Sequence, residues 1–230
     1  GQMPGWGGYD YARMTKALNA IEPYDIGNNI ERSANVAKGA VEYLLQGRQS
    51  FFNLLTMSMH DYYTYTHSVH VCTYAIALAQ TLGINDPRML NELGTGALLH
   101  DIGKSRVPKE IIQKKGPLTG EEMEEMKRHP DYGLEIAIQT ETISELARYP
   151  IIQHQEKVDG TGYPNGLTEG EIHIFGRITA IADVFDAMTT NRSYSKAQSF
   201  YDTLKFLVTE RGKHLDIKLL GEFVRLLGDR

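Results

Sequence analysis

The chain has 230 residues, of which 41% are hydrophobic and 23% are charged. These values are ordinary for a globular protein with one substantial core, so they exclude a chain that is disordered because of its composition. The formal net charge of −5 argues against a protein that binds along a nucleic-acid polymer, as does the lack of a long basic run. A small anionic ligand is compatible with this charge, because metal ions can reverse the field inside a cleft.

Cysteine usage and hydropathy bear on the compartment. Cys72 is the single cysteine and cannot form a disulfide within the chain. This is typical of a reducing compartment, and we expect a cytoplasmic protein. No apolar run approaches the ~20 residues that a membrane-spanning helix needs, so we expect no membrane segment.

Apolar residues recur at helical spacing along most of the chain, and no convincing strand pattern appears. We therefore predict an all-α fold. Residues 1–49 are predicted to be a helical lead-in, the remnant of a connection to an upstream domain. Residues 50–230 are predicted to be the main domain. The predicted helices span residues 11–21, 26–45, 67–82, 87–99, 108–113, 119–130, 131–139, 143–155, 177–188, 197–211 and 216–227.

Local signals define several helix ends. Gly83 is a stop signal, and Asp86-Pro87 supplies an N-cap followed by a proline at the first helical position. Thr119 and Glu122 have the spacing of a capping box. Pro150 is expected to bend or divide the helix over 143–155.

Residues 157–176 form the one long irregular segment, which contains Asp159-Gly160-Thr161-Gly162-Tyr163-Pro164. A loop of this length inside a compact helical chain is more often functional than a passive connection. We therefore expect this loop to contribute to a site.

Candidate metal ligands lie at helix ends or on apolar helices. Mixed imidazole and carboxylate ligands without sulfur do not favour a structural zinc site. They suit two divalent transition metals, Fe or Mn first and Ni, Co or catalytic Zn next. Any one histidine alone is more often a buried residue with local hydrogen bonds, but the set together favours metal binding. The candidates are His67, His100, Asp101, His129, His154 and Asp183.

Two blocks in this set are distinctive: His100-Asp101-Ile102-Gly103-Lys104, and residues 154–164, which read His-Gln-Glu-Lys-Val-Asp-Gly-Thr-Gly-Tyr-Pro. With shorter blocks at 65–68, 129–133 and 182–189, they resemble the HD-GYP group of the HD superfamily of metal-dependent phosphohydrolases. The resemblance covers roughly residues 50–228.

The resemblance implies an HD-domain helical bundle that hydrolyses cyclic di-GMP to linear pGpG and onward to GMP. It implies that the six candidates are metal ligands, with Asp101 bridging and catalytic. Lys104 would contact the scissile phosphate, Tyr163 would contact the substrate and Arg192 would hold a phosphate. Family analogy also suggests diguanylate cyclases or other signalling proteins as partners, and a homodimer.

Three positions depart from the family pattern. His154-Gln155 replaces two adjacent histidines, and a glutamine oxygen is the weaker ligand, so we expect a second metal that binds less tightly or with changed geometry. Tyr63 stands where three-metal members have an acidic ligand, so we expect two metals. After Arg192 the chain reads Ser193-Tyr194-Ser195-Lys196, so the phosphate clamp is expected to be weakened or displaced to Lys196.

These departures leave alternatives open. One is a catalytically degenerate domain that binds cyclic di-GMP or a partner protein. A hydrolase for another nucleotide is less consistent with the Gly-Tyr-Pro loop. Single residues have plainer interpretations too: a solvated cation for Lys104, loop packing for Tyr163 and a surface ion pair for Arg192.

Three further residues have no assigned role in the resemblance. Glu156 and Asp186 are expected either to orient ligands or to form salt bridges within the loop. His70 is expected to be structural or solvated.

Overall fold

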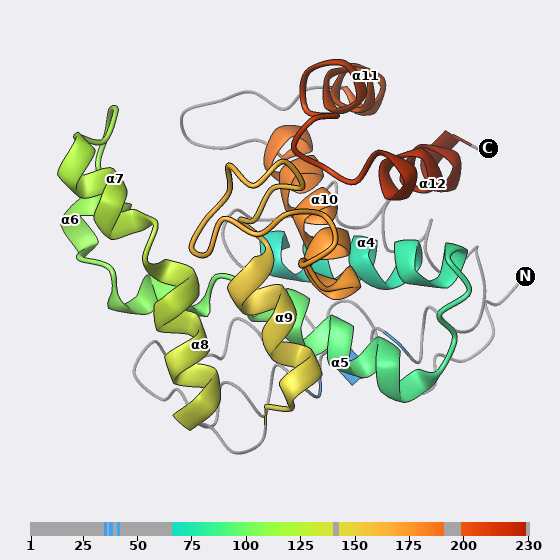
Figure 1. Ribbon diagram of the computed structural model, residues 1–230, viewed down its shortest axis with the longest axis horizontal. Coiled ribbons are helices and arrows are strands. Elements are labelled where there is room, and N and C mark those ends of the chain that lie inside the picture. The colour runs from blue at the N-terminus through green and yellow to red at the C-terminus, as the bar shows by residue number, and fades with distance from the viewer. Residues whose placement is uncertain are drawn as a thin grey trace, which may run out of the picture.

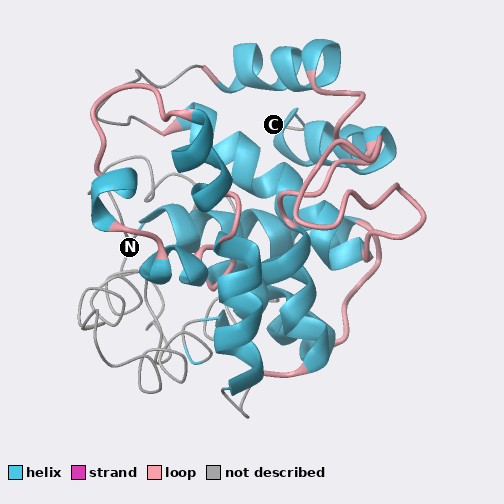
Figure 2. Ribbon diagram, turned by 60° about the vertical axis from the view of Figure 1, so that its left-hand side comes forward, coloured by secondary structure: helices cyan, strands magenta, loops and turns pink. Residues whose placement is uncertain are grey.

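The computed structural model describes residues 66–139, 143–190 and 199–228, together with positions 35, 37, 38 and 41. These residues form helices joined by turns and loops, with no strand among them, as Figure 2 shows. The all-α prediction is confirmed. A single bridge between Asp159 and Thr168 joins two parts of the long loop. Within the same residues, no helix combines the length and hydropathy required to cross a membrane.

Four helices form the centre of the molecule (Figure 1): α4 (Thr66–Thr81), α5 (Pro87–Leu98), α9 (Glu145–Gln153) and α10 (Ile174–Thr189). They pack in a closed ring, because α4 contacts α5, α5 contacts α9, α9 contacts α10, and α10 returns to α4. Every residue from 69 to 79 of α4 is buried. Helix α4 is therefore buried around its whole circumference and is enclosed by its neighbours.

The remaining helices surround this ring. A short 3₁₀ helix, η1 (Ile102–Arg106), packs on α8 (His129–Gln139), which also contacts α9. Helices α6 (Lys109–Ile112) and α7 (Gly120–Met126) form a hairpin that projects from one side of the molecule (Figure 1). Helices α11 (Phe200–Glu210) and α12 (Ile217–Gly228) lie against α10, and α12 also packs on α4.

The predicted helix ends are largely confirmed. The Asp86 side chain accepts a hydrogen bond from the Arg88 N–H at 2.9 Å, with Pro87 in the first turn. Thr119 and Glu122 form the predicted capping box. Gly83 has φ +81°, a conformation that favours glycine after a helix.

The predicted boundary between two neighbouring helices is wrong. The helix expected over 119–130 ends at Met126, and His129 begins α8 instead. Pro130 explains this difference, because a proline fits the first turn of a helix, where its missing N–H has no partner to lose. The correction places His129 at the start of a helix.

The predicted lead-in lies almost entirely outside the described residues, so the boundary at 49/50 stays a prediction. Ala37 and Val41, two residues of its expected apolar face, are buried in the main core. Cys72 is buried too, and burial raises the pKa of its thiol to about 12. A raised thiol pKa disfavours the reactive thiolate form.

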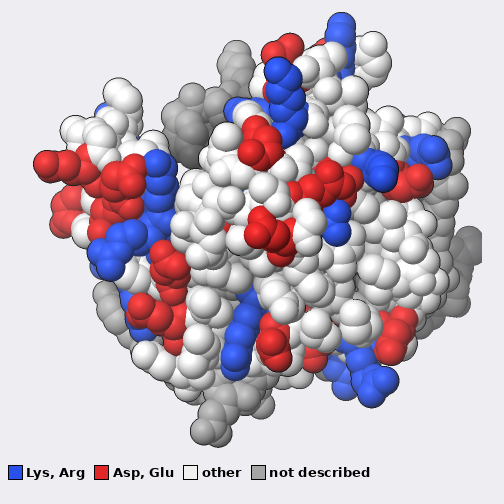
Figure 3. Space-filling model, in the orientation of Figure 1, with Lys and Arg blue, Asp and Glu red and all other residues white. Residues whose placement is uncertain are grey.

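Charged side chains of both signs are interspersed on the face shown in Figure 3. Several acidic side chains of the α6–α7 hairpin pair with nearby lysines, such as Glu124 with Lys127 at 2.7 Å and Glu122 with Lys114. This mixed pattern differs from the basic stripe that nucleic-acid binding requires.

Phe223 of α12 is fully buried and contacts the rings of Tyr74 and Phe185 edge-on at centroid distances of 6.0 Å and 5.0 Å. We expect Phe223→Ala to lower the free energy of unfolding by about 3–5 kcal/mol, because the cavity lies where three helices meet. Chemical denaturation measures this change. Tyr201→Ala is the control, because Tyr201 is 73% exposed, and an effect as large there would contradict the packing described.

Candidate metal centre

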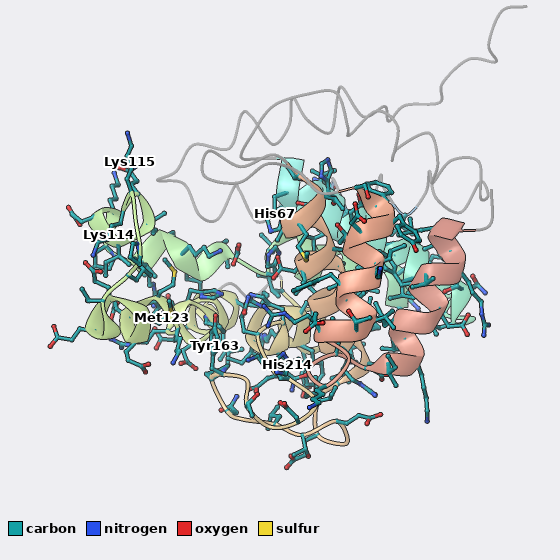
Figure 4. All side chains as sticks on the ribbon, turned by 90° about the horizontal axis from the view of Figure 1, so that it is seen from above. His67, Lys114, Lys115, Met123, Tyr163 and His214 are labelled. Carbon is teal, nitrogen blue, oxygen red and sulfur yellow. The ribbon has the colours of Figure 1, made fainter. Side chains whose placement is uncertain are left out.

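The six predicted ligands converge on one centre. His67 lies on α4, His100 and Asp101 between α5 and η1, His129 at the start of α8, His154 at the end of α9 and Asp183 on α10. They form three overlapping groups, within each of which the ligand atoms lie within 4.8 Å of one another. Figure 4 shows His67 in the middle of the molecule, well away from the hairpin that carries Met123.

Three of the histidines are oriented by backbone carbonyls. The Nδ1 atoms of His100, His129 and His154 lie 2.8 Å, 2.8 Å and 3.0 Å from the carbonyl oxygens of Ala97, Met126 and Pro150. A carbonyl can only accept, so each Nδ1 carries the proton. Each Nε2 therefore presents a lone pair to the centre, as metal-binding histidines do.

These lone pairs are left without partners. The Nε2 atoms of His129 and His154 face one another at 3.1 Å, although neither has a proton to donate. His100 Nε2 and Asp101 Oδ1 are buried and have no hydrogen-bond partner among the described residues. Burying lone pairs that have no hydrogen-bond partner costs free energy unless a cation lies between them. The donor set thus fits divalent metal ions.

Asp101 has the geometry of a bridging carboxylate. Its Oδ1 lies 3.4 Å from His129 Nε2 and 3.8 Å from His154 Nε2, whereas its Oδ2 lies 3.4 Å from His100 Nε2. The two oxygens thus face different histidines. Asp183 Oδ1 completes the other side, 3.2 Å from His67 Nε2 and 3.8 Å from His100 Nε2.

The protonation states suit metal binding. Burial raises the pKa of Asp101, but His100 and Lys104 outweigh it and hold this pKa well below its usual value. Burial lowers the pKa of His154 to about 3 and also lowers that of His129, so both rings are neutral. Neutral imidazoles beside ionised carboxylates are the forms that coordinate a cation.

His67 is flanked by two carboxylates. Its Nε2 faces Asp183, and its Nδ1 lies 2.6 Å from Asp186 Oδ2. Burial lowers the pKa of His67, but the hydrogen bonds to Asp183 and Asp186 outweigh it and raise this pKa to about 10. Burial raises the pKa of Asp183 and of Asp186, but hydrogen bonds outweigh it. The bond with His67 helps to hold the pKa of Asp183 below its usual value, and the bonds with His67 and His70 lower that of Asp186 to about 2. A metal ion would replace the proton on Nε2.

Gly103 allows the close approach that assembles this centre. A Cβ atom at this position would lie 1.9 Å from the His129 carbonyl oxygen and 2.4 Å from the Gly133 nitrogen. Only glycine therefore lets η1 rest directly on the backbone of α8. That contact places Asp101 and Lys104 beside His129.

The centre opens toward solvent on the side of Lys104. The side chain of His100 is fully buried, that of Asp101 is 20% exposed and that of Lys104 is 40% exposed. Lys104 Nζ donates to Asp101 Oδ2 at 2.5 Å. The half-buried Tyr163 ring lies edge-on to His129 at 6.2 Å. Two of the predicted substrate contacts thus lie near the predicted ligands, Lys104 beside Asp101 and Tyr163 beside His129.

Glu156 holds the loop that carries Tyr163. Its buried carboxylate accepts hydrogen bonds from the backbone N–H groups of Asn165 at 2.7 Å and Leu167 at 3.0 Å. Gly162 fits tightly, because a Cβ there would lie 2.3 Å from the Lys157 nitrogen. Neither expected role of Glu156 is found among the described residues, since its hydrogen bonds go to the loop backbone and not to a predicted ligand or a cation.

Gln155 lies beside the centre, and its expected weakening of the second metal stays a prediction. Its amide Nε2 lies 3.4 Å from Asp183 Oδ2, so the side chain turns a donor, and not its oxygen, toward the centre. Arg192, Lys196 and Tyr63 lie outside the described residues, so the phosphate clamp and the two-metal count stay predictions.

Two further residues lie behind His67, and sequence reasoning assigned a role to only one of them. Asp186 lies 2.6 Å from Nδ1 of the predicted ligand His67, in agreement with one of its two expected roles. His70, expected to be structural or solvated, is buried against the same carboxylate at 2.6 Å. The available signal was spacing: His67 and His70, and Asp183 and Asp186, are three residues apart on helices that pack together.

Comparison with known proteins agrees with this arrangement. The family model described as "HD domain" matches residues 45–219, most of the chain. The chain belongs to the HD domain family. The solved structure of a protein from Bdellovibrio bacteriovorus, described as an HDG"Y"P protein, superposes with a TM-score of 0.71 at 23% identity, over 94% of this chain and 77% of that one. At this identity the likeness shows the shared helical fold.

Two curated relatives are more similar in sequence. A protein named as a cyclic di-GMP phosphodiesterase from Pseudomonas aeruginosa is 35% identical over 94% of this chain and 50% of its own length. A protein named as a 3′3′-cGAMP-specific phosphodiesterase from Vibrio cholerae is 36% identical over 92% of this chain and 40% of its own length. The chain thus spans about half the length, or less, of these relatives.

Gly103→Ala tests the close approach between η1 and α8. We expect it to lower the free energy of unfolding by about 1–3 kcal/mol, as overpacking does, and to weaken metal binding because Asp101 moves away from His129. Denaturation and a chelator competition measure the two effects. Gly120→Ala is the matched control, because a Cβ there meets nothing within 4 Å. Equal behaviour of the two variants would contradict the account.

Proposed function

We propose that this chain is a two-metal phosphodiesterase that hydrolyses cyclic di-GMP to pGpG and onward to GMP. One observation carries the proposal: six nitrogen and oxygen ligands converge with unpaired lone pairs facing one another, as with His129 and His154 at 3.1 Å. Membership of the HD domain family supports metal dependence, and relatives named as cyclic di-GMP phosphodiesterases support the substrate.

The ligand set favours particular metals. Four imidazoles and two carboxylates without a thiolate suit Fe or Mn, with Ni, Co and Zn as the other candidates. One group, His67 with His100 and Asp101, would hold one ion, and the group of Asp101, His129 and His154 would hold the other. Asp101 belongs to both groups, which supports its proposed bridging role.

The charge balance explains why a cyclic dinucleotide would need these ions. Asp101 and Asp183 are both ionised, because their pKa values are lowered. Two carboxylates alone repel a phosphodiester, whereas two divalent cations carry four positive charges and reverse the local field. When bound, the ions activate water and neutralise charge on the phosphate.

The chain's own residues would orient the substrate. Lys104 is a compact cation beside Asp101, placed to donate to a phosphate oxygen where charge develops. Tyr163 stands edge-on to His129 with its loop held by Glu156, so its ring can line the space beside the ligands. Arg192 and Lys196 are proposed as the phosphate clamp on the family resemblance alone.

A second candidate substrate is 3′3′-cGAMP, for which the relative from Vibrio cholerae is named. Cyclic di-GMP and 3′3′-cGAMP share the phosphodiester ring and differ in one base, so the same metal centre could act on either. A degenerate domain that only binds a cyclic dinucleotide is the alternative from another class, and Gln155 is the residue that favours it. The proposed cytoplasmic location, homodimer and signalling partners stay predictions.

Hydrolysis of cyclic di-GMP and 3′3′-cGAMP, followed by chromatography of the products, tests the proposal. We expect pGpG from the unsubstituted protein loaded with Mn²⁺ or Fe²⁺. Asp101→Asn should lower the metal content and reduce turnover by more than ~100-fold. This loss is larger than that caused by removing a residue that only hydrogen-bonds a ligand. Lys104→Met should reduce turnover and leave metal content unchanged.

Glu124→Gln serves as the control, because Glu124 is exposed on the distant hairpin. Faster hydrolysis of 3′3′-cGAMP than of cyclic di-GMP would support the proposed reaction but make 3′3′-cGAMP the preferred substrate. Bound metal without hydrolysis of either dinucleotide would contradict the proposed activity.

A further inference from the structure

A second histidine shares the carboxylate that holds the metal ligand His67. We propose that His70 is a positioning residue, which orients the His67 ring toward the metal ions by fixing Asp186. This inference rests on the proposed function, because it assigns His70 a role toward the proposed metal centre.

Two histidines of α4 and two aspartates of α10 form a continuous chain of polar contacts between these helices. Asp183 faces His67 Nε2 at 3.2 Å, and Asp186 Oδ2 lies 2.6 Å from His67 Nδ1. Asp186 Oδ1 lies 2.6 Å from His70 Nδ1 and also accepts from the Thr190 hydroxyl at 3.0 Å. Both oxygens of one buried carboxylate are thus engaged, each with one of the two histidines.

This sharing fixes the orientation of His67. Because Asp186 only accepts, it holds a proton on His67 Nδ1 and leaves Nε2 to the metal, as outer partners of metal ligands do. The three hydrogen bonds to Asp186 together restrict the rotation of its carboxylate. Without His70, Oδ1 would keep only the longer bond from the Thr190 hydroxyl, at 3.0 Å in place of 2.6 Å, as its described partner. Asp186 would then be held less firmly, and so would the His67 ring.

Packing alone does not account for a histidine at this position. His70 is 5% exposed, and its Nε2 is buried with no hydrogen-bond partner among the residues that the structure describes. A leucine would fill similar space in the apolar helix α4 without burying an unpaired nitrogen. The bond from Nδ1 to Asp186 is the interaction that offsets this cost.

The test compares His70→Leu with His70→Asn. An asparagine amide nitrogen lies near the position of Nδ1 and can donate to Asp186, whereas leucine cannot. We expect His70→Leu to weaken Mn²⁺ binding by ~10–100-fold in a chelator competition, and His70→Asn to restore binding close to that of the unsubstituted protein. Where His70→Leu does not fold, His70→Gln replaces it, because its amide extends past the Nδ1 position.

A second measurement does not depend on turnover. Nitrogen-15 NMR of the metal-free protein reports the state of the His67 ring. We expect one fixed His67 signature in the unsubstituted protein and in His70→Asn, and an altered or averaged one in His70→Leu. His173→Leu is the control: it removes the N-cap of α10, so it should lower stability but leave metal affinity unchanged.

Unchanged metal affinity and an unchanged His67 signal in His70→Leu would overturn the inference. So would equal losses in His70→Leu and His70→Asn, because packing would then be the whole role. If the unsubstituted protein binds no metal, the proposed function fails, while the NMR comparison still decides whether His70 orients His67.

Discussion

The centre depends on proton placement at the histidines. Carbonyl oxygens at the ends of α5, α7 and α9 accept from His100, His129 and His154, so that their Nε2 lone pairs point inward. His67 is turned inward by a carboxylate instead. A protein interior tolerates such facing lone pairs only where a cation lies among them. The donor set thus links the helical fold directly to metal chemistry.

The helices are arranged so that their ends meet at this point. The carbonyls that orient the three rings lie in the last turns of helices, where carbonyl oxygens are available to a side chain. That of Pro150 also accepts from the His154 backbone N–H at 3.3 Å. The ring of α4, α5, α9 and α10 supports the centre, and Gly103 lets η1 pack directly against the backbone of α8. The long loop carries Tyr163, one of the groups expected to touch substrate, and Glu156 restrains this loop.

Much of this arrangement could be predicted from sequence, because caps, apolar periodicity and ligand spacing are local or repetitive. The α7 capping box, the Asp86-Pro87 start of α5 and the convergence of the six ligands are examples. Other features depend on contacts between distant segments. The bond between His70 and Asp186 spans 116 residues and needs a known helix pairing. Gln155 was expected to offer an oxygen, but the direction of its amide depends on Asp183 across the centre.

The metal content of anaerobically purified protein tests the central claim most directly. Elemental analysis, with native mass spectrometry to count ions on each chain, should find about two transition-metal ions per chain. Both should be lost when Asp101 is replaced, because its carboxylate belongs to the two ligand groups that are proposed to hold the two ions. A folded protein that binds no transition metal, even after reconstitution with Fe²⁺ or Mn²⁺, would contradict the account.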